Sequence, residues 1–518
     1  MRTFDAVVVG SGFGGAVAAC RLAERGGSVV VLERGRRWER TDFPRPGQPR
    51  ARWWFQGDER GLFELRRFAG MKVIVAAGVG GGSLVYTNVQ KIPPAAAFQG
   101  WPEPVSLDSL HPYYARVEEM LDPSPIPHPL VRLQAFEAAH ATLGRAEGLE
   151  RPPLAIRWGE GDLERANRFG ALQKPCNLCG QCIFGCDRHA KNTLDLTYLK
   201  RAETLGAEVW PLCQVNRIEP RALGYEVRFR RLPDREAGKP EEETVAARRL
   251  YLAAGSLGTT ELLLRARDVD ATLPKLSRRL GEGWSPNGDF FAGLIGSRIP
   301  IQPTVGPSVA AGYESAPEGF YVLEGAIPPA AAEPHKTLLR LVNHLLSLRL
   351  FFSGRSDSSS PGDTPACADP ESEELLRHMG VFFLMGRESS HPSTPFGTGG
   401  RLRLGPRGEL ELDWDARESE LLFGRIRRYL AELGRGYGGW MVVPERWWAP
   451  DLGSVHPLGG CGMGRDASAG VVDAFGRVFG YENLFVCDGS IVPRALGVPP
   501  SMTIAALAEH VVENSVSG

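Results

Sequence analysis

Three features are missing from this sequence of 518 residues, and each absence excludes a class of protein. No run of about 18 apolar residues occurs, so a transmembrane helix is not expected. Neither charge sign is in excess, with 60 Lys and Arg against 61 Asp and Glu, which argues against a nucleic-acid partner because no basic surplus could neutralise phosphates. Internal repeats are also absent. A chain of this length exceeds a single typical core and predicts two or more domains.

The chain begins with a strand, a glycine turn and a helix. Apolar residues run without a break from Ala6 to Val9, as in a strand buried on both faces. A second strand at 28–33 ends in Glu33, 18 residues after Gly15. Glycines at this spacing let the backbone approach a pyrophosphate at a helix N-terminus, and the acid accepts a hydrogen bond from a ribose hydroxyl. The residues predicted to bind a dinucleotide, FAD or NAD, are Gly10, Gly12, Phe13, Gly14, Gly15 and Glu33.

The first strand starts at residue 4, so no signal peptide is expected and a cytoplasmic location is the default. In that compartment, the nine cysteines are expected to be thiols or metal ligands rather than disulfides.

A second glycine-rich segment spans residues 77–88 and is flanked by apolar residues. Its backbone can lie flat against a planar ring system, whereas a flexible linker would be polar. A strand that runs into a glycine turn at 250–258 completes this half of the predicted cofactor site. The cofactor contacts predicted from the two segments are Gly78, Gly81, Gly82, Ser83, Asn88, Ala254 and Gly255.

Near the end of the chain, His456 lies in a turn with glycines at 459 and 460. A strand, an Asp-Gly turn and a closing helix follow it. This arrangement would present the histidine to the cofactor as a base, a role for which a pKa near neutrality is suited. The cofactor contacts predicted here are Asp488, Gly489, Pro499, Pro500 and Met502.

Together these motifs resemble the glucose–methanol–choline (GMC) oxidoreductases, and within them the cholesterol-oxidase-like branch. The segments that carry the resemblance are residues 10–15, 78–84, 253–258, 284–289, 456–461, 488–493 and 503–509. The resemblance implies FAD, a two-domain fold and oxidation of an alcohol by hydride transfer to flavin N5. It also implies that His456 positions the substrate hydroxyl and accepts its proton.

Two positions depart from the family pattern. Cholesterol oxidases read Gly-Val-Asn-Pro before the last helix, whereas this chain has Pro499 in place of the asparagine. Proline offers neither a side-chain hydrogen bond nor a backbone N–H, which puts oxidation of cholesterol itself in doubt. The nearest match to the family's isomerising glutamate is Glu333, for which an exposed loop residue is the alternative interpretation.

Four cysteines have the C-x2-C-x2-C-x3-C spacing of bacterial ferredoxins: Cys176, Cys179, Cys182 and Cys186. This spacing predicts a [4Fe-4S] or [3Fe-4S] cluster. Asp187 stands where a proline normally follows, and Cys213 or Cys367 could instead supply a remote fourth ligand. Zinc bound by four thiolates and a metal-free structural loop, of the kind that related sequences carry here, stay open as alternatives.

The motifs divide the chain into two predicted domains. We expect an α/β, Rossmann-like and discontinuous FAD-binding domain from residues 1–94, 187–292 and 451–518. An inserted α+β substrate or cap domain, built on an antiparallel sheet, is expected from residues 95–186 and 293–450. It includes the cysteine-rich loop 176–186.

Aromatic loops at 52–55 and 440–448 and an apolar stretch at 341–352 favour a hydrophobic alcohol or sterol over a sugar, and allow a peripheral membrane contact. O2 or an electron carrier would take the electrons. One alternative is a flavin and iron–sulfur dehydrogenase that passes electrons to a protein or quinone carrier. Another is a flavin-binding protein with non-alcohol chemistry, for example light-driven. The oligomeric state leaves no readable sign in the sequence.

Overall fold

The computed structural model describes residues 1–43, 45, 53–55, 59–233, 239–329, 370–387, 399–443 and 452–516. Several residues singled out in the sequence lie outside this part of the chain: Glu333, Cys367, Trp447, Trp448 and the segment 341–352. Among the described residues, none of the helices is long and apolar enough to cross a membrane.

The largest sheet has seven strands, in the order β8-β2-β1-β11-β10-β9, with β20 pairing with β11. Its strands are β1 (Arg2–Val9), β2 (Val29–Leu32), β8 (Glu208–Trp210), β9 (Cys213–Arg221), β10 (Gly224–Arg231), β11 (Glu241–Leu252) and β20 (Leu484–Val486). The pairs around β1, β2 and β8 and the β11–β20 pair are parallel, whereas β9 and β10 add an antiparallel edge. The predicted apolar stretch Ala6–Val9 is buried within β1.

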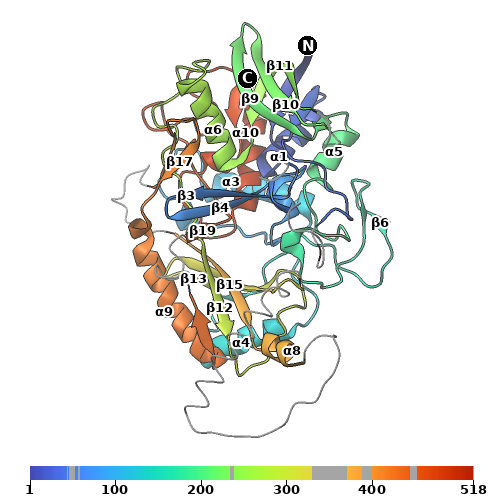
Figure 1. Ribbon diagram of the computed structural model, residues 1–518, viewed down its shortest axis with the longest axis vertical. Coiled ribbons are helices and arrows are strands. Elements are labelled where there is room, and N and C mark those ends of the chain that lie inside the picture. The colour runs from blue at the N-terminus through green and yellow to red at the C-terminus, as the bar shows by residue number, and fades with distance from the viewer. Residues whose placement is uncertain are drawn as a thin grey trace.

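Five helices pack around this sheet in the upper half of the molecule (Figure 1). They are α1 (Phe13–Glu24), α3 (Leu107–Leu121), α5 (Tyr198–Thr204), α6 (Gly255–Asp268) and α10 (Ser501–Ser515). The α1 helix contacts both α5 and α10, which explains why its alanines at 16, 18 and 19 are all buried. Small side chains allow helices to approach closely on several sides.

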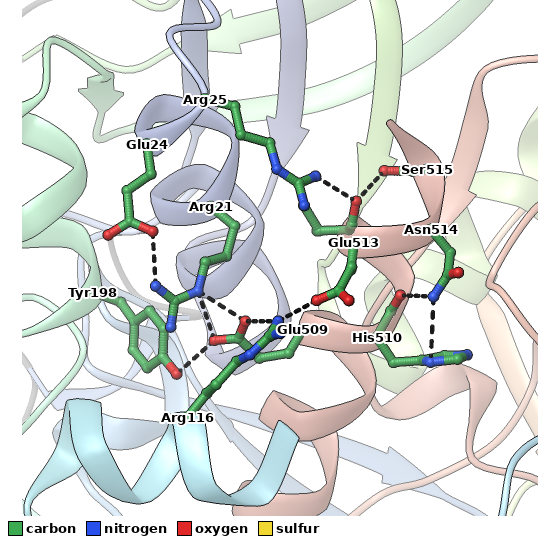
Figure 2. A network of polar contacts seen from close by, with 11 residues as sticks. Arg21, Glu24, Arg25, Arg116, Tyr198, Glu509, His510, Glu513, Asn514 and Ser515 are labelled. Carbon is green, nitrogen blue, oxygen red and sulfur yellow. Dashed lines mark hydrogen bonds and ion pairs between the residues drawn. The ribbon is translucent and has the colours of Figure 1, made fainter. Parts of the chain in front are cut away.

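An ion-pair network around Glu509 fastens four of these helices together (Figure 2). The fully buried Glu509 carboxylate of α10 accepts hydrogen bonds from Arg21 Nε of α1, at 2.8 and 2.9 Å, and from the Tyr198 hydroxyl of α5, at 2.9 Å. Arg116 of α3 lies 3.9 Å from it. A buried carboxylate requires such charged and hydrogen-bonding partners. The network therefore fixes α1 relative to α10, and both helices begin at predicted cofactor-binding turns.

The second large sheet has six strands in the order β18-β12-β15-β14-β13-β5 and lies in the lower half of Figure 1. Its strands are β5 (Leu149–Glu150), β12 (Phe290–Ile295), β13 (Val309–Ser315), β14 (Phe320–Gly325), β15 (Gly380–Gly386) and β18 (Trp440–Val442). All of its pairs are antiparallel.

One face of the six-stranded sheet is covered by α4 (Val131–Thr142) and α9 (Glu420–Tyr437). Alternate strand residues, among them Phe290 and Phe382, pack into this core, as a period of two requires. The α9 helix buries an apolar stripe with helical spacing and ends at Gly438, whose φ of 67° is typical of a glycine after a helix. The helix α8 (Pro370–Arg377) lies at the far end of the sheet (Figure 1).

Three smaller sheets complete the described structure. They are β19-β4-β3 (Leu452–Ser454, Met71–Ala76 and Phe63–Phe68), β16-β17 (Arg401–Leu404 and Leu410–Asp413) and β6-β7 (Arg165–Ala166 and Leu172–Gln173). The first lies between the two large sheets (Figure 1). Short 3-10 turns occur at Gly81–Leu84, Ala95–Phe98, Cys182–Phe184, Ala416–Ser419 and Gly489–Ile491.

The predicted fold class is confirmed: a discontinuous Rossmann-like α/β unit accompanies an α+β unit built on an antiparallel sheet. The residue limits assigned to the two domains stay a prediction. The strands β16 and β17 pair with each other in a separate hairpin.

Candidate active site

The turn between β1 and α1 contains three glycines that the surrounding protein requires. A Cβ atom on Gly10 would lie 2.4 Å from the Ala253 carbonyl oxygen, and Gly10 has a φ of 95°. A Cβ on Gly14 would lie 2.0 Å from the Cys487 oxygen, and one on Gly15 would lie 1.9 Å from the Gly10 oxygen. These glycines bring three separate segments of the chain into close contact.

Gly12 differs from its neighbours because neither its backbone conformation nor the surrounding protein atoms require a glycine at this position. Its φ of −69° suits any residue, and an added Cβ would meet no atom within 4 Å. Gly82 is likewise open on its Cβ side. Gly12 also caps the N-terminus of α1, whose first turn carries no acidic residue. An open glycine at an uncompensated helix N-terminus fits a bound pyrophosphate, which needs close approach to the backbone.

Ser11 and Glu33 link this turn to the glycine loop (residues 77–88). Glu33 Oε2 accepts hydrogen bonds from the Ser11 backbone N–H at 3.0 Å and from the Ser11 hydroxyl at 2.7 Å. Ser11 Oγ in turn accepts the Gly80 N–H at 3.1 Å. Glu33 also accepts the Gly35 N–H at 2.8 Å, and its remaining lone pairs can receive a ribose hydroxyl.

The glycine loop lies directly against the first turn. A Cβ on Gly81 would lie 2.6 Å from Gly12 Cα, so Gly81 must lack a side chain where it packs against the backbone of Gly12. The Ser83 hydroxyl accepts the Leu194 N–H at 3.0 Å, which holds the loop from behind. Asn88 is fully buried, and neither polar atom of its side chain has a hydrogen-bond partner among the described residues. Unsatisfied buried amide atoms indicate a partner of another kind, as a cofactor would supply.

The remaining predicted cofactor residues converge on the same region. Asp488 accepts the Gly255 N–H at 2.8 Å, the Thr259 hydroxyl at 2.5 Å and the Ser490 N–H at 2.8 Å. Burial raises the pKa of Asp488, while these hydrogen bonds lower it. Asp488 thus ties Ala254 and Gly255, at the start of α6, to the Asp-Gly turn. Phe13 and Gly78 also lie at this meeting point, in the first turn and the glycine loop.

The turn before α10 is held by Asn287, which the sequence analysis did not single out. Its Oδ1 accepts the N–H groups of Leu496 at 2.8 Å and Gly497 at 3.1 Å, and its Nδ2 donates to the Val498 carbonyl at 2.9 Å. Pro499 and Pro500 follow at once and are buried, as is Met502 in the first turn of α10. The position of Pro499 is therefore set by a buried asparagine from another segment.

His456 is held by Asp289, a second residue that the sequence analysis did not assign to the site. Asp289 Oδ1 lies 2.8 Å from His456 Nδ1, and its Oδ2 accepts the N–H groups of Val455 at 2.8 Å and His456 at 3.1 Å. The Asp289 side chain is 2 % exposed and that of His456 is 25 % exposed. The carboxylate fixes the proton on Nδ1, which leaves Nε2 as the basic nitrogen.

If His456 is the predicted base that takes the proton of an alcohol, replacing Asp289 with Asn should lower the rate at which that alcohol reduces the flavin by about 100- to 1,000-fold, because an amide can stabilise the wrong tautomer of His456. FAD content should stay at the wild-type level. Anaerobic stopped-flow absorbance measures the rate, and the flavin-to-protein absorbance ratio measures the content. A rate within about threefold of wild type would show that the aspartate does not orient the base.

An apolar wall lies against β19, the strand that ends two residues before His456. Phe291 and Phe383, on neighbouring strands of the six-stranded sheet, pack edge to face with their ring centroids 5.9 Å apart. A Cβ on Gly453, three residues before His456, would lie 3.8 Å from the Phe291 ring. Both rings are only half-buried and lie on the face away from α9. This arrangement suits an apolar group near the segment that carries His456.

The cysteine-rich loop is ordered by hydrogen bonds to sulfur. The N–H groups of Leu178, Ser308 and Ala190 donate to the Sγ atoms of Cys176, Cys182 and Cys186, respectively, at 3.3 to 3.4 Å. Burial raises the pKa of Cys176 and Cys186, and that of Cys179 to about 11.

Within the described part of the chain, no group of three or more His, Cys, Asp or Glu side chains is arranged to hold a metal ion. The predicted iron–sulfur cluster thus finds no support in the structure, and no step below depends on it.

Sequence comparison identifies the family. The N-terminal and C-terminal family models of GMC oxidoreductases match residues 4–267 and 448–508. A cholesterol oxidase of Acinetobacter baumannii is 28% identical over 98% of this chain and 93% of its own length. A long-chain-alcohol oxidase of Arabidopsis thaliana is 26% identical over 97% of this chain and 66% of its own length.

Structural comparison agrees with this assignment at the level of the fold. The crystal structure of pyridoxine 4-oxidase from Mesorbium loti superposes with a TM-score of 0.59 over 98% of both chains, at 17% identity. The chain belongs to the GMC oxidoreductase family and is an FAD-dependent enzyme that acts on CH–OH groups.

Proposed function

We propose that this protein oxidises the hydroxyl group of a hydrophobic alcohol or sterol. The observation that carries the proposal is the His456–Asp289 pair, in which a buried carboxylate holds Nδ1 at 2.8 Å and leaves Nε2 without a protein partner among the described residues. The apolar wall of Phe291 and Phe383, near the strand that leads to His456, supports a hydrophobic substrate. So does the similarity to cholesterol oxidase and long-chain-alcohol oxidase.

In the proposed reaction, His456 Nε2 accepts the proton of the substrate hydroxyl. Removal of this proton makes departure of a hydride from the adjacent carbon easier, and Asp289 stabilises the imidazolium that forms. Bound FAD supplies the acceptor for the hydride. The half-buried aromatic rings exclude water from the carbon side of the alcohol, while the polar side meets the histidine.

We further propose that the predicted cofactor residues hold FAD. Gly12 and the N-terminus of α1 would receive the pyrophosphate, Glu33 the ribose, and the glycine loop with Asn88 the ring system. The open Cβ sides of Gly12 and Gly82 and the unsatisfied Asn88 amide support this assignment. Residues 1–94, 187–292 and 451–518 would form this FAD-binding domain.

A substrate panel under anaerobic conditions tests the proposal. We expect long-chain alcohols and sterols to bleach the flavin absorbance, and glucose to leave it unchanged at equal concentration. Cholesterol should react more slowly than a primary long-chain alcohol, because Pro499 lacks the polar side chain that cholesterol oxidases place there. The proposal would be contradicted if glucose were the only compound that bleached the flavin. It would also be contradicted if none of the alcohols bleached the flavin in the dark.

We propose O2 as the electron acceptor, in line with the oxidases to which the chain is similar. Electron transfer through a cluster at the four cysteines rests on their spacing and stays a prediction from sequence. Measurement of iron and acid-labile sulfide in anaerobically purified protein distinguishes direct reaction with O2 from electron transfer through a cluster. Stoichiometric iron and sulfide, with slow reaction toward O2, would favour a dehydrogenase that feeds a carrier.

A further inference from the structure

Two buried charged side chains lie behind the glycine loop. Lys191 is 1 % exposed, and its Nζ donates to the carbonyl oxygens of Leu84 at 2.9 Å, Tyr86 at 3.0 Å and Cys182 at 2.9 Å. The first two carbonyls belong to the glycine loop. All three donors of an ammonium group are thus used, which is the geometry of the charged form. No described residue forms an ion pair with Lys191 within 4 Å. Burial lowers the pKa of Lys191 to about 8, and the charge of Asp195 opposes this shift.

Asp195 lies at the other end of the same loop. Its Oδ1 is buried without a hydrogen-bond partner among the described residues, 3.2 Å from where a Cβ atom on Gly80 would be. The pKa of Asp195 is raised by burial to about 6, so the carboxylate is mostly ionised at neutral pH. The short segment 191–195 thus places a buried cation and a buried anion against the two ends of the glycine loop.

Simple structural support does not account for this arrangement. Burial of a charge costs free energy unless an opposite charge compensates it, and a neutral side chain could hold the loop carbonyls at lower cost. Reduction of a flavin adds electrons next to this loop in the proposed site. A buried charge acts on that added negative charge through a low effective dielectric, so it changes the equilibrium between the oxidised and reduced forms.

We propose that Lys191 and Asp195 set the reduction potential of the bound flavin in opposite directions, Lys191 raising it and Asp195 lowering it. The inference rests on the proposed FAD site, in which the glycine loop contacts the ring system. Both residues act through the loop and are positioning residues rather than catalytic ones. Lys191 supports reduction by a weakly reducing alcohol, whereas Asp195 keeps the reduced flavin able to pass its electrons on.

The test is an anaerobic redox equilibration of the FAD-loaded enzyme with a reference dye at pH 7. For Lys191→Met we expect the equilibrium to shift about tenfold toward oxidised flavin, which is about 30 mV for a two-electron couple. For Asp195→Asn we expect a shift toward reduced flavin of about threefold to tenfold. Lys91→Met is the matched control, because Glu150 and Glu314 compensate Lys91 at 2.8 and 2.9 Å in the six-stranded sheet. It should leave the equilibrium unchanged.

The opposite signs separate this role from a merely structural one, which would weaken FAD retention in both variants without moving the potential in opposite directions. Shifts of the same sign, or no shift in Asp195→Asn, would overturn the proposal. If Lys191→Met fails to retain FAD, Lys191→Arg replaces it in the test. This variant keeps the charge and should retain the wild-type reduction potential. A tenfold shift of the equilibrium in Lys191→Arg would also overturn the proposal. No alcohol is present in this experiment, so opposite shifts in an enzyme that oxidises no alcohol would contradict the proposed function alone.

Discussion

Replacement of His456 with Gln is expected to lower the rate of flavin reduction by alcohol about 100- to 10,000-fold, the range that a positioned general base contributes. The Nε2 atom is the only basic nitrogen that the Asp289 contact leaves free on this ring. Glutamine keeps a similar size and polarity but cannot accept the hydroxyl proton. Stopped-flow absorbance under anaerobic conditions measures the rate of flavin bleaching.

FAD content and thermal stability are the controls for this variant. Among the described residues, His456 forms hydrogen bonds with Asp289 and Ser454 and none with the glycine loop or the first turn, so both properties should stay at wild-type values. The expected fall should be larger than that of Asp289→Asn, because the aspartate acts only through the histidine. A His456→Gln variant that reduces its flavin at close to the wild-type rate would remove the assignment of the base.

Replacement of Gly12 with Ala is expected to remove FAD without unfolding the protein. Its added Cβ would meet no protein atom within 4 Å, so the methyl group would occupy the space in front of the α1 N-terminus. We expect at least a tenfold loss in FAD affinity, measured by fluorescence titration of the apoprotein. Circular dichroism and the urea midpoint of the apoprotein should match those of wild-type apoprotein.

Gly14→Ala, two residues further on, is the matched control. Its Cβ would lie 2.0 Å from the Cys487 carbonyl oxygen, a clash with backbone that β20 and β11 hold in place. We expect this variant to lose about 3 kcal/mol of unfolding free energy or to be insoluble. If Gly12→Ala unfolds the apoprotein as severely as Gly14→Ala, or binds FAD as tightly as wild type, the open space before Gly12 is not the pyrophosphate site.

The segments of the proposed cofactor site could be located from sequence because their motifs depend on local spacing. The β1–α1 turn and the glycine loop each carry their signal within a dozen residues, and Glu33 follows Gly15 by 18 residues. The structure then separates glycines that look equivalent in the sequence. Gly14 packs against backbone and Gly12 faces open space, a distinction that depends on a segment more than 470 residues away at Cys487.

The substrate half was less accessible to sequence reasoning. Asp289 is 167 residues from His456, and only the fold brings their side chains together at 2.8 Å. Asp289 and Asn287 lie within the 284–289 motif, so their segment was recognised although their roles were not. Buried polar residues in a tight turn directly before an aromatic strand were the available signal. The Glu333 assignment lies outside the described residues and stays a prediction.

The central claim is alcohol oxidation at a flavin with His456 as the base, and an isotope effect tests it most directly. FAD-loaded enzyme is mixed anaerobically, in the dark, with a long-chain primary alcohol that carries either hydrogen or deuterium on the hydroxyl-bearing carbon. The account predicts flavin bleaching that is several-fold slower with the deuterated alcohol, since cleavage of that bond accompanies reduction. Absence of bleaching with either alcohol, or with any member of the substrate panel, would contradict it.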